Sequence, residues 1–102
     1  MKYYSLNQQS PTVSFKEATI KGQAPDKGLY FPESLPRLNK SWIAGINEMS
    51  NASIAFDVIQ PYVGNDIPED ELRRIVAETV NFPSPLVQVN DHIFALELFH
   101  GP

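Results

Sequence analysis

The chain has 102 residues, of which 42% are hydrophobic and 20% are charged, with a net charge of −4 and no cysteine. This length suits one domain of about 100 to 150 residues, and no stretch approaches the roughly 18 to 20 apolar residues of a membrane span. The acidic charge argues against a nucleic-acid surface, and the lack of cysteine excludes a disulfide framework or a thiolate zinc site.

The first five residues are not followed by the apolar core of a signal peptide. We therefore expect a cytoplasmic protein with neither a membrane nor a nucleic acid as its partner.

The first third of the chain predicts a strand, a helix and a shaped loop. Tyr3 and Tyr4 open the strand. Ser14 and Glu17 have the spacing of a capping box, which predicts a helix that begins after Ser14 and ends at Gly22.

Residues 22–32 hold two glycines and two prolines, which is typical of a tightly shaped loop. Asp26 can accept bonds from its own backbone and Gly28 tolerates left-handed geometry, so a turn is predicted between them. Residues 29–31 predict a brief strand that Pro32 stops.

The middle of the chain predicts two helices after a surface connection at residues 33–41. Ser41 is the expected cap of the first, short helix. Residues 50–63 form the second, and Pro61 predicts that it ends near residue 59 or 60. Its apolar face is wide enough to imply burial on two sides. That face comprises Ala52, Ile54, Ala55, Phe56, Val58, Ile59 and Val63.

A third helix is predicted from Pro68 onward, because Pro suits a first turn and residues 69–71 are acidic at the positive end of the helix dipole. The dipole explains these carboxylates without a ligand, so no metal site is predicted. The expected buried stripe is Leu72, Ile75, Val76 and Val80, and the expected solvent face is Arg73, Arg74 and Glu78.

The last part of the chain predicts a rigid linker at residues 81–85 and a β-hairpin formed by residues 86–89 and 93–99. Residues 93–99 are almost continuously apolar, which is typical of a strand with neighbours on both faces. An apolar run so close to Pro102 suggests that more chain follows it. His100 follows this strand, but taken alone it is interpreted as a surface residue without a chemical role.

From the residues alone, the chain is an α+β domain with three or four helices packed on a short β-sheet and without a complete active site.

Three stretches resemble the N-terminal domain of the threonine synthase family, in the same order along the chain. Residues 2–5 and 13–18 look like its opening strand and first helix. Residues 22–32 resemble its Gly-Leu-Ala-Pro-Asp-Gly-Gly-Leu-Tyr-x-Pro, with Gln23 in place of an apolar residue and Lys27 in place of the first of two glycines. That exchange fits if the site has an ordinary negative φ. Residues 97–102 match its Glu-Leu-Phe-His-Gly-Pro.

This resemblance implies a lyase of amino-acid biosynthesis that uses pyridoxal phosphate (PLP) to convert O-phosphohomoserine and water into threonine and phosphate. It places the cofactor lysine beyond Pro102, so we expect the chain itself to be inactive, with no catalytic, cofactor-binding or metal residue. None of its lysines lies in the cofactor motif; they are Lys2, Lys16, Lys21, Lys27 and Lys40.

The resemblance also implies a domain division and a set of site residues. Residues 1–92 would be the N-terminal domain, and residues 93–102 would begin the PLP-binding catalytic domain, truncated here. The expected partners are the enzyme's own PLP domains. The residues expected to border the active site are Phe99, His100, Gly101 and Pro102.

One alternative stays open at this point. The same residues would also suit a freestanding α+β binding or interaction module with no catalysis, in which every motif has only a structural role.

Overall fold

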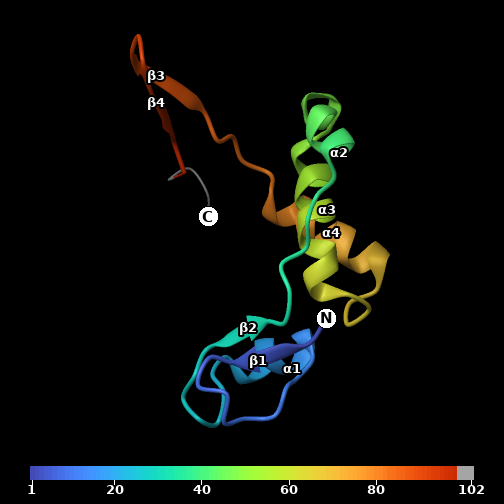
Figure 1. The fold of residues 1–102 in the computed structure, drawn as a ribbon. Helices are drawn as coiled ribbons and strands as arrows, with labels where there is room; N and C mark the ends of the chain where they lie inside the picture. Colours follow the sequence, from blue (N-terminus) through green and yellow to red (C-terminus); the bar gives the residue numbers. More distant parts are fainter. Residues whose placement is uncertain (99–102) are drawn as a thin grey trace.

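The computed structural model describes residues 1–98 and has an α+β architecture with two separate sheets of two antiparallel strands each (Figure 1). The elements are β1 (Tyr3–Ser5), α1 (Phe15–Lys21), β2 (Tyr30–Pro32), α2 (Lys40–Ala44), a 3-10 turn (Ile46–Glu48), α3 (Asn51–Val63), α4 (Glu69–Thr79), β3 (Leu86–Asn90) and β4 (Ile93–Leu96). They form an N-terminal unit (residues 1–32), a helical unit (residues 40–80) and a hairpin (residues 85–97).

The N-terminal unit is built around β1. This strand pairs with β2, and Tyr3 also exchanges backbone hydrogen bonds of 2.9 Å with Val13. The predicted capping box of α1 is confirmed, because Ser14 Oγ accepts a hydrogen bond of 3.1 Å from the Glu17 amide. β2 begins one residue later than predicted and includes Pro32, which an edge strand tolerates because it pairs on one side only.

The cap of α2 differs from the prediction. Asn39 Oδ1, rather than the Ser41 hydroxyl, accepts the hydrogen bond of 2.7 Å from the Trp42 amide. The Ser41 hydroxyl donates to Asn39 Oδ1 instead. Asparagine caps a helix at least as well as serine, so the earlier residue takes the position and α2 begins at Lys40.

The predicted end of α3 at residue 59 or 60 is wrong, because the helix continues through Pro61 to Val63. Proline removes one amide donor, yet the Gly64 amide donates to the Gln60 carbonyl at 2.8 Å and closes the last turn. Val63 is only 3% exposed in the helical core. We infer that its burial compensates for the hydrogen bond that Pro61 cannot make.

The described residues bury two small apolar clusters. The first joins α3 to α4 through Phe56, Val63, Leu72 and Val76, and the second joins β1 to α1. Phe15 packs against both.

Only one side of α3 is buried, so the expected burial on two sides is not found within residues 1–98. Val58 and Ile59 are exposed, and so is Ile75 on α4, which the sequence predicted to be buried.

Charged groups on α4 stabilise the helix surface. Arg73 pairs with Glu69 at 2.8 Å and lies 3.7 Å from the centre of the Phe56 ring, while Arg74 pairs with Glu71 and Glu78.

Among residues 1–98, no cluster of three or more His, Cys, Asp or Glu side chains is placed to hold a metal ion. The helices of this part of the chain do not reach the length and apolarity of a membrane crossing.

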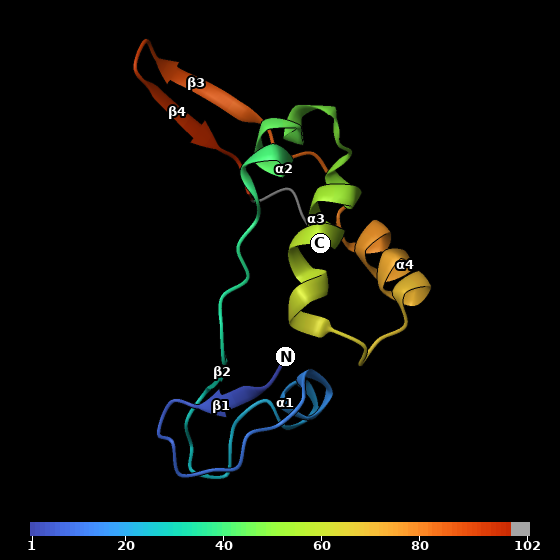
Figure 2. The same cartoon turned by 45° about the vertical axis from the view of Figure 1, so that its right-hand side comes forward.

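The hairpin stands apart from the rest of the structure. It and the N-terminal unit lie at opposite ends in both views (Figures 1 and 2). Every residue of β3 and β4 is exposed, so the apolar run that the sequence predicted to be buried is not covered by the described chain. The Cα radius of gyration is 16.9 Å, against about 13 Å for a compact domain of this length.

Candidate functional site

The predicted border residues of the active site lie outside the described residues. They are Phe99, His100, Gly101 and Pro102. The candidate features that the structure does describe are the loop at residues 22–32, its junction with the helical unit, and the exposed apolar surfaces.

The loop is organised by one carboxylate. Asp26 Oδ2 accepts hydrogen bonds from the Ser5 hydroxyl and from the Gln9 amide at 2.9 Å, and Asp26 Oδ1 accepts from the Gly28 amide at 2.9 Å. The Asp26 amide in turn donates to Ser10 Oγ at 3.1 Å. These bonds tie the segment after β1 to the turn before β2.

The same contacts set the charge state of Asp26. The Ser5 hydroxyl is the main cause that holds the pKa of this carboxyl below its ordinary value of 3.8, and the Gly28 and Gln9 amides act in the same direction, whereas desolvation opposes them. A carboxylate surrounded by donors stays ionised and is a poor proton donor or acceptor at neutral pH. Asp26 is therefore a structural residue.

The turn has its left-handed residue at Lys27, whose φ is 68°, so the expectation of an ordinary negative φ there is wrong. Gly28 is needed for a different reason: a Cβ on it would lie 3.0 Å from both the Asn7 amide nitrogen and Asp26 Oδ1. Lysine tolerates the left-handed region only at a cost in free energy, which the bonds around Asp26 offset.

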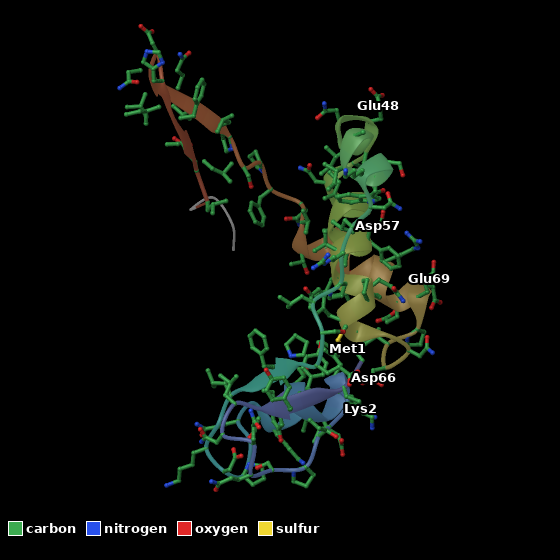
Figure 3. The ribbon with its side chains drawn as sticks, in the orientation of Figure 1. Met1, Lys2, Glu48, Asp57, Asp66 and Glu69 are labelled. Carbon is green, nitrogen blue, oxygen red and sulfur yellow. The ribbon has the colours of Figure 1, made fainter. Side chains whose placement is uncertain are left out.

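Two long-range hydrogen bonds fix the N-terminal unit to the helical unit. The Tyr3 hydroxyl donates to the Tyr62 carbonyl at 2.8 Å, and the Lys16 amide donates to Asp66 Oδ2 at 2.7 Å. Figure 3 labels Asp66, which accepts the second of these bonds. Burial raises the pKa of Tyr3, and the nearby Tyr62 and Asp66 add to the rise. Sequence reasoning missed this junction because its partners lie 50 or more residues apart.

The junction lies near an apolar groove of about 300 Å³ between α3 and α4, open along Ile59 and Ile75. The groove is lined by Phe15, Ala55, Ile59, Val63, Ile67, Leu72, Ile75, Val76, Thr79 and Val80. A surface of this kind fits the side chains of another polypeptide better than a charged metabolite, because it offers no charged group.

The described residues do not fit PLP. A cofactor lysine needs a partly closed pocket with donors for the phosphate. All five lysines of the chain are exposed, and none of them lines the apolar groove. No step of the chemistry is therefore assigned to residues 1–98.

The turn generates a stability prediction. Lys27→Gly should raise the free energy of unfolding by about 0.5 kcal/mol, because it removes about 1–2 kcal/mol of left-handed strain and adds about 0.5–1 kcal/mol of chain entropy in the unfolded state. Gly28→Ala should lower it by about 1–3 kcal/mol, because the new Cβ has no room. Urea titrations of both variants would measure this. A stabilising Gly28→Ala would contradict the assignment.

The Asp26 carboxylate generates a pH prediction. Its pKa is lowered on folding, so the stability it contributes is present above its ordinary pKa of 3.8 and is lost as the pH falls through the folded value. Asp26→Asn should therefore destabilise the chain at pH 7, and the gap to the unmodified chain should narrow below about pH 4. Thermal unfolding across pH 2.5–7 would measure it. Asp91→Asn, in the exposed hairpin turn, is the control, and an equal loss at every pH would refute the role.

Comparisons with known proteins connect these features to one family. The family model described as "Threonine synthase N terminus" matches residues 2–80. A threonine synthase of Pseudomonas aeruginosa is 36% identical over the whole chain, and one of Escherichia coli is 31% identical.

Solved structures agree with the sequence relatives. The whole chain superimposes on 23% of the PLP-bound threonine synthase from Brucella melitensis, with a TM-score of 0.92 and 36% identity. For the Escherichia coli threonine synthase the TM-score is 0.90 over 99% of the chain.

The chain spans about a quarter of these relatives: 23% of the Pseudomonas protein and 24% of the Escherichia coli protein. The matched family model covers more than half of the chain, and the strand, capped helix, shaped loop and paired helices that it spans are all present in the structure. The chain therefore belongs to the threonine synthase family and corresponds to its N-terminal part.

Proposed function

We propose that this chain is the N-terminal part of a PLP-dependent threonine synthase, which converts O-phosphohomoserine and water into threonine and phosphate. The observation that carries the proposal is the match of the whole chain, at 36% identity and a TM-score of 0.92, to a PLP-bound threonine synthase. When bound, PLP supplies the electron sink for the reaction. In this proposal the cofactor lysine lies in the part of the enzyme that the chain does not span.

The role proposed for residues 1–98 is to pack on the enzyme's own PLP domains and to help exclude water from the closed site. Two features support this role. The apolar groove and the hairpin leave large apolar side chains uncovered, and the radius of gyration of 16.9 Å exceeds that of a self-sufficient domain. An apolar groove would also suit a freestanding binding module, so what counts against that module is the match of the whole chain to 23% of a threonine synthase.

We further propose that the protein is cytoplasmic, which suits an acidic chain without cysteine. Its proposed partners include neither a nucleic acid nor a membrane, and the proposed small-molecule partner is O-phosphohomoserine.

The cofactor assignment predicts a difference between this chain and a protein extended through the remaining coding sequence. After incubation with equimolar PLP and removal of free PLP by gel filtration, the chain alone should keep no visible band and should keep its mass on borohydride reduction, because exposed lysines hold PLP only as a readily hydrolysed Schiff base. The extended protein should show a reducible band, gain one cofactor and release phosphate from O-phosphohomoserine. An extended protein that does none of these would favour the binding module.

The proposed border of the active site comprises Phe99, His100, Gly101 and Pro102, which lie outside the described residues. In the extended protein, His100→Asn should lower kcat/KM for O-phosphohomoserine by about tenfold or more, the equivalent of one lost polar contact of about 1.4 kcal/mol. The reducible cofactor band should persist. His92→Asn, in the exposed hairpin turn, is the matched control, and equal effects of the two variants would argue against a site role for His100.

A further inference from the structure

We propose that Phe82 is a positioning residue of the enzyme, because it fastens the connection between α4 and β3 to the side of α3. Through that connection it fixes the helical unit relative to the strand that leads into residues 99–102. This inference rests on the proposed function, in which residues 99–102 border the active site. Phe82 acts through these residues and touches neither substrate nor cofactor.

Phe82 is the residue of the connection that faces the helical unit. Residues 81–85 form no helix or strand, and most of them are exposed, whereas Phe82 is half-buried. Figures 1 and 2 show the connection beginning beside α3. Phe82 lines a recess together with apolar side chains of the helical unit: Ile54, Ala55, Val58 and Val80. Because an aromatic ring buries a large apolar area, this recess gives the connection a preferred seat on α3.

The connection is stiff between Phe82 and the hairpin. Pro83 and Pro85 have fixed φ angles, and each restricts the residue before it to extended conformations. The two residues restricted in this way are Phe82 and Ser84, so the backbone of residues 82–85 has little conformational freedom. A displacement of Phe82 is therefore passed on to β3 rather than absorbed on the way.

The connection is also bonded directly to the end of β4. The Glu97 amide donates a hydrogen bond of 2.9 Å to the Pro85 carbonyl. Glu97 comes shortly before Phe99 in the sequence. The path from the recess on α3 to the proposed border of the active site is therefore short, since it runs through residues 83–85 and one hydrogen bond.

Loss of this anchor has a distinctive kinetic consequence. Without the Phe82 ring, the helical unit and the hairpin would occupy several relative positions, of which one is competent to bind substrate. The apparent affinity then falls in proportion to the competent fraction, whereas saturating substrate selects the competent position and restores the rate. Partial unfolding has the opposite effect, because inactive molecules lower kcat and leave KM unchanged.

The kinetic test uses the extended protein. Phe82→Ala should raise KM for O-phosphohomoserine by about fivefold or more and leave kcat within about twofold, with the reducible cofactor band retained. Phe82→Leu should keep KM near the unmodified value, because leucine also fills an apolar recess. Phe31→Ala is the matched control, since it removes the same ring from an exposed position on β2, and it should change neither constant.

A second measurement tests the anchor without catalysis. In the 102-residue chain, NMR relaxation should give the amides of β3 and β4 the same rotational correlation time as those of α3 and α4. Phe82→Ala should shorten this time for the hairpin alone, and Phe31→Ala should leave the two times equal.

Three results would overturn the proposal. If Phe82→Ala lowers kcat with KM unchanged, or changes neither constant, Phe82 does not position the site. If Phe31→Ala raises KM as much, the effect is not specific to the connection. If the hairpin of the unmodified chain already tumbles independently, Phe82 does not fasten it. An unmodified extended protein without a reducible cofactor band would instead contradict the proposed function, and the relaxation measurement would still decide whether Phe82 holds the connection on α3.

Discussion

The structure depends on Phe15, which packs against both of the small apolar clusters that the described residues bury. One cluster holds β1 against α1, and the other holds α3 against α4. Phe15 stands at the start of α1, where the capping box of Ser14 and Glu17 fixes the direction of the helix. Without this ring, the two units would be joined mainly by the hydrogen bonds from Tyr3 and Lys16.

Polar contacts hold the loop around Asp26, where few apolar side chains are buried. Ser5 is fully buried, and its hydroxyl donates to Asp26, whose carboxylate organises a loop that has almost no core of its own. The same network holds Lys27 in a left-handed conformation that the isolated residue would avoid. A charged group used in this way gives the loop a fixed shape, and it makes the stability of the loop depend on pH.

The exposed apolar surfaces connect the fold to the proposed function. The radius of gyration is 16.9 Å, and a chain of this length with its own complete core would have a smaller one. The open groove along Ile59 and Ile75 and the uncovered hairpin are what a part of a larger enzyme would leave for its neighbouring domains. In the proposed function the chemistry belongs to those domains, and this part contributes shape and closure.

The sequence by itself determined the features that rest on local interactions: the capping box of α1, the acidic first turn of α4, the hairpin and the family motifs at residues 22–32. Only the tertiary structure decided the features that depend on distant residues. Burial of Val63 carries α3 past Pro61, donors from the segment after β1 set the turn around Lys27, and no described element covers the strand that begins at Ile93. Local propensity cannot report these outcomes, because the free energy that decides them comes from contacts between segments far apart in the chain, or from a neighbouring domain.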